Sequence, residues 1–168
     1  MKATAELTSG QWVADGLKDL IITEEMNDVH ILLVEDNEGD ILLTKEAFDE
    51  RKIITKFSVV RNGKDAVDFL FKEGKFTNVE TPDLVLLDIN LPLKNGLEVL
   101  REIKSRESTR KIPVIMLTTS SSDKDIADSY REYASSYITK PLEMKDFLKA
   151  VLQIEEYWLQ LIKLPSKK

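Results

Sequence analysis

The sequence contains no cysteine and only one histidine, His30, among its 168 residues. Without cysteine, neither a disulfide framework nor a thiolate metal site is possible. One histidine cannot supply a multi-histidine metal site or a Ser-His-Asp triad, so we expect His30 to be a structural residue at the end of a strand. The candidate functional residues are therefore carboxylates, hydroxyls and amines.

Long apolar segments and an excess of basic charge are also missing. No apolar run exceeds a few residues, so we expect no membrane span, and no apolar segment typical of a signal peptide precedes Trp12. The net charge of −6 and the pI near 5.0 argue against direct nucleic-acid binding. Together with the lack of cysteine, these features predict a cytoplasmic protein.

Strand-like and helix-like segments alternate from Val29 onward. Continuous aliphatic runs at 31–34, 84–87 and 114–117 are typical of strands that are covered on both faces, as in a parallel sheet. This alternation predicts a doubly wound α/β domain with five parallel strands. We predict strands near residues 30–35, 56–61, 83–88, 113–118 and 136–139, and helices near 38–51, 63–73, 95–105, 122–134 and 143–162.

The predicted domain covers residues 29–164 and leaves two terminal segments. Residues 1–28 form an N-terminal extension in which apolar residues between Trp12 and Ile21 have approximate helical spacing. This extension is interpreted as a loosely packed or disordered arm, with a docking helix for a partner as the alternative. Residues 165–168 form a short tail.

Charged and hydroxyl residues follow the predicted strands where each strand ends. Glu35 and Asp36 follow the first strand, Asp88 ends the third, Thr118 ends the fourth, and Lys140 follows the fifth. In doubly wound sheets, ligands bind outside the carboxyl ends of the strands. Residues more than a hundred positions apart are therefore expected to meet in one pocket.

Two or three carboxylates in one pocket repel one another, and a hard divalent cation removes that penalty. We predict a Mg²⁺ (or Mn²⁺) site with Asp36 and Asp88 as direct ligands and the Asn90 backbone carbonyl as a third. Glu35 would act directly or through water. The alternative for Glu35 and Asp36 is helix capping, because acids are favourable before a helix.

A carboxylate beside a cation and an ammonium group can also attack phosphorus. We predict that Asp88 forms an acyl phosphate, that Lys140 and the cation offset charge on the transferring oxygens, and that Thr118 hydrogen-bonds one of them. The alternatives are a solvated strand-end hydroxyl for Thr118 and an ordinary surface lysine for Lys140.

The same residues lie in motifs that resemble the receiver domain of two-component response regulators, over roughly residues 29–162. The motifs are Val-Glu-Asp-Asn at 34–37, Leu-Leu-Asp-Ile-Asn-Leu-Pro at 86–92 with Gly96, Met-Leu-Thr-Thr at 116–119 and Tyr-Ile-Thr-Lys-Pro at 137–141. The resemblance implies a flavodoxin-like sheet of strand order 2-1-3-4-5. It also implies a signalling protein, not a classical enzyme, whose Asp88 accepts phosphate from a histidine kinase in the presence of Mg²⁺.

The resemblance also implies a role for each motif residue. Thr118 and Tyr137 match the switch pair that moves on phosphorylation. The resemblance further implies that the protein assists its own phosphorylation and dephosphorylation. The remaining matches are the acidic metal pair Glu35 and Asp36, the phosphate-contacting Lys140, and Asn90 and Ser120, whose positions tune phosphate lifetime.

The C-terminal segment carries a narrower resemblance. Residues 154–159 with Leu164-Pro165 look like the single-domain regulators that are paired with phytochrome kinases. Only four residues follow Leu164, so we expect the signal to leave by protein contact, with a downstream target or a histidine phosphotransfer protein.

The predicted last helix has two adjacent apolar stripes, which is more than one surface helix normally needs. One hypothesis is a symmetric homodimer whose interface includes Phe147, Val151, Ile154 and Trp158. The alternative is that loops or the N-terminal extension cover the excess.

Several other functions remain as alternatives. A phosphorelay shuttle would use the same Asp88 and pass the phosphate to a histidine protein. A phosphoaspartate hydrolase needs an acid at position 90, where Asn90 stands, and a flavin carrier needs a phosphate-binding loop where residues 35–38 are mostly acidic. A scaffold that is not phosphorylated would have no use for the acid, hydroxyl and lysine set.

Overall fold

The computed structural model describes residues 29–50, 55–119 and 123–140, together with a few isolated positions between 143 and 153. The predictions for residues 1–28, for most of the helix near 143–162 and for the tail lie outside the described residues. So do Ser120 and the proposed interface residues Phe147, Val151, Ile154 and Trp158.

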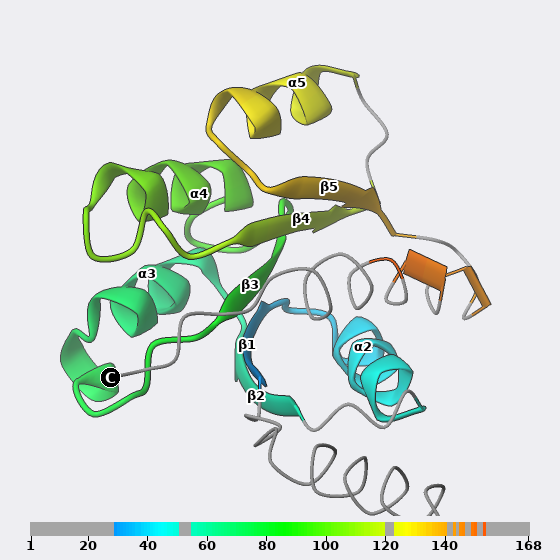
Figure 1. Cartoon of the computed structure of the whole chain (residues 1–168), viewed down its shortest axis with the longest axis horizontal. Coiled ribbons are helices and arrows are strands. Elements are labelled where there is room, and N and C mark those ends of the chain that lie inside the picture. Colours follow the sequence, from blue (N-terminus) through cyan, green and yellow to red (C-terminus); the bar gives the residue numbers. More distant parts are fainter. Residues whose placement is uncertain are drawn as a thin grey trace, which may run out of the picture.

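The centre of the fold is a five-stranded parallel sheet (Figure 1). Its strands are β1 (Val29–Val34), β2 (Thr55–Val60), β3 (Leu84–Asp88), β4 (Val114–Thr118) and β5 (Ser136–Thr139). The strand order is β2-β1-β3-β4-β5, and every neighbouring pair is parallel. This arrangement confirms the predicted doubly wound, flavodoxin-like fold.

Within the described residues, four α-helices and one short 3₁₀ helix lie in the connections between these strands. They are α2 (Glu38–Glu50), α3 (Gly63–Phe71), η1 (Gly74–Phe76), α4 (Gly96–Ser105) and α5 (Asp123–Arg131). In Figure 1, α3 and α4 cover one face of the sheet, α2 lies on the other, and α5 lies beside β5. None of the helices in the described ranges is long and apolar enough to cross a bilayer.

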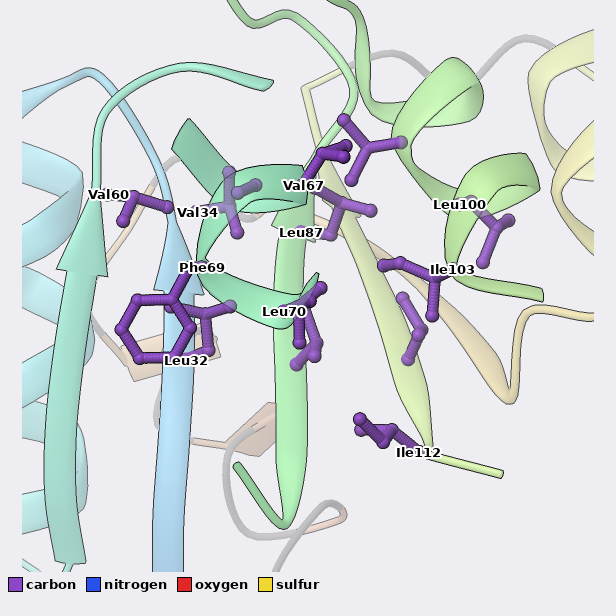
Figure 2. Close-up of a cluster of buried hydrophobic side chains, with 14 of the residues drawn as sticks. Leu32, Val34, Val60, Val67, Phe69, Leu70, Leu87, Leu100, Ile103 and Ile112 are labelled. Carbon is purple, nitrogen blue, oxygen red and sulfur yellow. The ribbon is translucent and has the colours of Figure 1, made fainter. Parts of the chain in front are cut away.

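Successive residues of the central strands are buried on opposite faces of the sheet, which explains why their sequences are apolar without alternation. Leu32 and Val34 of β1 belong to a core with α3 and α4, part of which is shown in Figure 2. Ile31 and Leu33 belong to a second core in which Phe48 of α2 is fully buried. Because both faces of the sheet are packed, the strands hold the residues at their carboxyl ends in fixed positions.

Two helices begin at asparagines that the sequence places directly before a glycine. The Asn62 side chain accepts a hydrogen bond from the backbone of Asp65, and Asn95 forms a reciprocal capping box with Glu98. These contacts satisfy backbone N–H groups that a helix start leaves without partners.

Helices α3 and α5 end two or three residues earlier than predicted. Lys72 after α3 and Tyr133 after α5 have left-handed backbone angles, with φ of 58° and 63°. Each is followed by a backbone hydrogen bond that closes the helix end, from Glu73 to Asp68 and from Ala134 to Ser129. Glycine usually takes this position, so its absence hid both helix ends from sequence analysis.

His30 is a structural residue at the opposite end of β1 from the predicted site. It is buried, its backbone N–H donates to Asp83 Oδ2 at 2.9 Å, and its Nε2 lies 2.9 Å from Ser58 Oγ. This position agrees with the structural role expected for it.

Candidate phosphoryl and metal site

The register of the parallel strands brings the predicted residues together at one edge of the sheet. Val34 pairs with Leu87, so Glu35, which follows Val34, lies beside Asp88. On the other side, Asp88 pairs with Leu117, which precedes Thr118. Thr118 pairs with Thr139, the residue before Lys140.

Three carboxylates form the acidic part of the site. Glu35, Asp36 and Asp88 each offer an oxygen, and these three oxygens lie within 4.8 Å of one another. Glu35 and Asp88 are buried, whereas Asp36 is exposed to incoming solvent and ions. The carboxylates supply the hard oxygen ligands that a divalent cation prefers. The exposed side of the site leaves room for the water molecules that such a cation keeps.

Burial raises the pKa of Glu35 above its ordinary value of 4.5, although hydrogen bonds from Lys140 and from the Asn37 backbone act in the opposite direction. The charge of Asp88 adds to the increase. Burial is thus the main cost of charging Glu35 and repulsion by Asp88 a smaller one, and a cation among the carboxylates lowers the free energy of the charged state.

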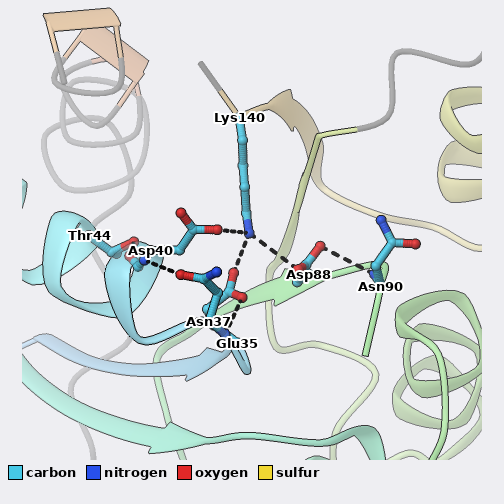
Figure 3. Close-up of polar contacts among 7 residues, drawn as sticks. All are labelled: Glu35, Asn37, Asp40, Thr44, Asp88, Asn90 and Lys140. Carbon is cyan, nitrogen blue, oxygen red and sulfur yellow. Dashed lines mark hydrogen bonds and ion pairs between the residues drawn. The ribbon is translucent and has the colours of Figure 1, made fainter. Parts of the chain in front are cut away.

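Lys140 is the basic residue of the site, and its side chain is only 9% exposed. Its Nζ donates to Glu35 Oε2, to Asp40 Oδ2 at 2.8 Å and to Asp88 Oδ2 at 3.2 Å, as Figure 3 shows. Burial alone would lower the pKa of Lys140, but the hydrogen bonds to Asp40 and Glu35 and the charge of Asp88 raise it above 10.5. The alternative of an ordinary surface lysine is therefore excluded.

Thr118 is fully buried, which excludes the alternative of a solvated hydroxyl. Its carbonyl oxygen accepts the backbone N–H of Lys140 at 2.6 Å, so the end of β4 is tied directly to the residue that carries the ammonium group. Tyr137 lies in β5 and is partly buried against the α3–α4 core. The switch roles of Thr118 and Tyr137 stay predictions.

The two residues after Asp88 turn the chain away from the sheet. The backbone N–H of Asn90 donates to Asp88 Oδ1 at 3.3 Å (Figure 3), and Asn90 is exposed. Asn90 therefore lies next to Asp88, and the use of its carbonyl as a metal ligand stays a prediction.

Asp40 is a site residue that sequence analysis missed. It lies in the first turn of α2, which begins at Glu38. No spacing in the sequence singled it out, because an acid in the first turn of a helix is common for reasons of the helix dipole alone. The neighbouring Asn37 Oδ1 accepts the Asp40 N–H at 3.0 Å, so Asn37 caps α2 and the acids Glu35 and Asp36 are not needed for capping.

Residues 31–152 match the response regulator receiver domain family. This chain belongs to that family. The receiver is 41% identical over 136 residues to the response regulator Rcp1 of Synechocystis, covering 81% of this chain and 92% of Rcp1. It is also 41% identical over 145 residues to the probable methanogenesis regulatory protein FilR2 of Methanothrix harundinacea, covering 86% and 92% of the two chains.

Solved structures of receivers have the same fold. The crystal structure of the phosphorylated cyanobacterial phytochrome response regulator RcpA matches with a TM-score of 0.78 and 43% identity, covering 83% of this chain and 99% of RcpA. The Mn²⁺-bound form of Rcp1 matches with a TM-score of 0.77 and 40% identity, covering 82% and 99%. The three carboxylates in this receiver fit a divalent cation of the kind that Rcp1 binds.

Proposed function

We propose that this receiver accepts a phosphoryl group on Asp88 from a phosphohistidine of a sensor kinase, in a reaction that requires Mg²⁺. The observation that carries this proposal is the arrangement around Asp88, with Lys140 Nζ 3.2 Å from Asp88 Oδ2 and the oxygens of three acids within 4.8 Å. An ammonium and a cation on either side of one carboxylate favour attack on a phosphoryl group.

In the transfer step, a carboxylate oxygen of Asp88 attacks phosphorus. A new O–P bond forms as the P–N bond of phosphohistidine breaks, and the imidazole nitrogen keeps the electron pair and takes a proton from solvent. Glu35, Asp36 and Asp88, with the Asn90 carbonyl, would hold Mg²⁺, which would supply positive charge next to the phosphoryl oxygens. Lys140 donates to one of these oxygens, and Thr118 donates to another.

The same side chains support a self-limited signal. We infer that Asn90, which is exposed beside Asp88, influences the water that hydrolyses the acyl phosphate, and that Ser120, two residues after Thr118 in the sequence, does so too. Thr118 and Tyr137 move when Asp88 is phosphorylated, and their movement alters the surface around β5. The receiver then signals through contact with another protein.

We also propose residues 29–164 as the receiver domain, with residues 1–28 as an extension and 165–168 as a tail.

The direct test is incubation with Mg²⁺ and acetyl phosphate, followed by intact mass measurement. We expect the mass of one phosphoryl group on the native protein and none on Asp88→Asn. A matched control is Asp65→Asn, because Asp65 lies on α3 and its carboxylate pairs with Lys75, whereas Lys140 pairs with Glu35, Asp40 and Asp88. Equal phosphorylation of Asp88→Asn and Asp65→Asn would overturn the assignment of Asp88.

We propose a phytochrome-type histidine kinase as the source of the phosphate. The similarity to RcpA and Rcp1 supports this choice, although FilR2, with a different named role, is equally identical at 41%. The test compares phosphotransfer from an autophosphorylated bacterial phytochrome kinase with transfer from an unrelated histidine kinase. Faster transfer from the unrelated kinase would contradict the phytochrome assignment and leave the role of Asp88 intact.

A further inference from the structure

Asp40 contacts the same ammonium group as Glu35 and Asp88 but belongs to neither the sheet nor the cluster of three acids. Its Oδ2 lies 2.8 Å from Lys140 Nζ. Its backbone is held on both sides, because its N–H donates to Asn37 Oδ1 at 3.0 Å and its carbonyl accepts from Thr44 Oγ1 at 2.7 Å (Figure 3). The start of α2 therefore presents this carboxylate to Lys140 from a fixed position.

The donors of the Lys140 ammonium group are fully used. An ammonium has three N–H donors, and Nζ donates to three different carboxylates, those of Glu35, Asp40 and Asp88. A phosphoryl oxygen that arrives on Asp88 needs one of these donors. One of the three contacts must therefore give way when Asp88 is phosphorylated.

Exposure decides which contact gives way most readily. The Asp40 side chain is 37% exposed, against 2% for Glu35 and 8% for Asp88. A carboxylate that loses its partner while buried pays a large desolvation penalty, whereas a partly exposed one is hydrated by water. Glu35 and Asp40 both stay charged when Asp88 becomes an acyl phosphate, and of these two Asp40 is the partner that Lys140 releases at the lower cost.

We propose that Asp40 is a positioning residue that competes with the phosphoryl group for the Lys140 ammonium. In the unphosphorylated receiver, Asp40 holds one N–H donor of Lys140, and a phosphoryl oxygen on Asp88 takes that donor over. This competition weakens the affinity of the resting site for a phosphoryl group. The inference rests on the proposed phosphorylation of Asp88.

The test is the affinity for beryllofluoride, a phosphoryl mimic, measured by titration calorimetry on the full chain at saturating Mg²⁺. Asp40→Asn keeps the shape of the side chain and removes the charge that attracts the ammonium. Because charge-assisted hydrogen bonds are about twice as strong as neutral ones, we expect beryllofluoride to bind on the order of tenfold more tightly. A separate titration of Mg²⁺ checks that each variant is saturated.

Glu38→Gln is the matched control for charge. Glu38 lies in the same turn of α2, pairs with Arg61 and has a side chain that is 77% exposed. Its substitution removes the same charge without a contact to Lys140. An equal increase in beryllofluoride affinity in both variants would mean that the loss of one negative charge near the site explains the effect, and this would overturn the proposal. Weaker binding of beryllofluoride by Asp40→Asn would also overturn it.

The Lys140→Met background separates competition from a purely structural role. Without the ammonium, Asp40→Asn should change the beryllofluoride affinity less than about twofold, within the range of independent sites. A gain that persists in this background would overturn the proposal. Thermal unfolding checks that each variant is folded, and Asp40→Ser serves as a second variant if Asp40→Asn does not fold.

Failure of the proposed function and failure of the Asp40 proposal give different results. If the folded native protein binds no beryllofluoride, the proposed function fails, and this inference fails with it. If the native protein binds it and Asp40→Asn binds it equally well, only the role of Asp40 is wrong.

Discussion

A Cβ atom on Gly96 would lie 2.2 Å from the carbonyl oxygen of Asp88. Gly96, the first residue of α4, thus packs directly on the backbone of the proposed phospho-acceptor. The Gly96 N–H also donates to the carbonyl oxygen of Ile89 at 2.8 Å. Glycine is needed at this position for space, because no other residue leaves room for the Asp88 carbonyl. The start of α4 and the position of Asp88 are therefore linked.

We expect Gly96→Ala to lower the free energy of unfolding by about 2 kcal/mol, as overpacking in a filled interior usually does. Because the clash is with backbone, the segment that carries Asp88 must move, and beryllofluoride binding should weaken as well. Urea unfolding and beryllofluoride titration measure the two effects separately.

Gly74→Ala provides the matched control. Gly74 has a φ of +57° and would meet no atom within 4 Å, so its substitution strains the backbone without a clash. It should cost about 1 kcal/mol of stability and leave beryllofluoride binding unchanged. Equal loss of binding in Gly74→Ala and Gly96→Ala would show that lowered stability, not the position of Asp88, causes the defect.

Lys140→Met should destabilise the metal-free protein by about 3 kcal/mol, because it leaves Glu35 and Asp88 buried without their ammonium partner. Mg²⁺ should restore more stability to this variant than to the native protein, since the cation then supplies the only compensating charge. Urea unfolding with EDTA and with Mg²⁺ measures both quantities.

Lys64→Met is the control for Lys140→Met. Lys64 pairs with Asp68 on the surface of α3, and its side chain is 65% exposed. Solvent screens exposed pairs of this kind, so they contribute little to stability and little change is expected. A comparable loss of stability in both variants would contradict the view that the Lys140 contacts are those of a buried cluster.

The raised pKa of Glu35 predicts a pH dependence with a definite sign. Because its pKa in the folded state lies above 4.5, the folded protein binds this proton more tightly than the unfolded chain does. The resulting stability is fully present below pH 4.5 and is lost as the pH rises through the raised pKa. Glu35→Gln, which stays neutral, should therefore gain stability over the native protein as the pH rises.

Urea unfolding in EDTA between pH 4.5 and neutral pH measures this difference in stability. A difference that stays constant across the range would contradict the raised pKa. A second readout is calorimetry in buffers of different ionisation enthalpy. Mg²⁺ needs the charged carboxylate, so its binding should release protons from the native protein in the lower part of this range and release fewer from Glu35→Gln.

The strand ends explain why most of the site was predictable from sequence. Parallel strands covered on both faces must be apolar throughout, so the first charged residue after each one marks the edge of the sheet. That rule located Glu35, with Asp36 next to it, and Asp88, whereas Lys140 follows β5, which is only partly buried, and was located as the residue after the fifth predicted strand. Their roles in phosphoryl transfer stay predictions.

The rest depended on contacts that have no periodic pattern. Asp40 lies on a helix, where an acid in the first turn is common for reasons of the helix dipole alone. Only the reach of Lys140 across from β5 makes it part of the site. Similarly, the ends of α3 and α5 depend on Lys72 and Tyr133 taking left-handed angles that tertiary structure imposes on them.

The capping box at the start of α4 gives a last prediction about the same segment. Asn95 accepts the Glu98 N–H at 2.9 Å, and the Glu98 carboxylate accepts the Asn95 N–H at 2.9 Å. Asn95→Ala removes the first contact and should lower the free energy of unfolding by about 1 kcal/mol, whereas Asn95→Asp keeps an acceptor and should remain near the native value. Thermal unfolding compares the two variants. Equal stability of Asn95→Ala and Asn95→Asp would show that Gly96 packing, not the cap, holds the start of α4 against Asp88.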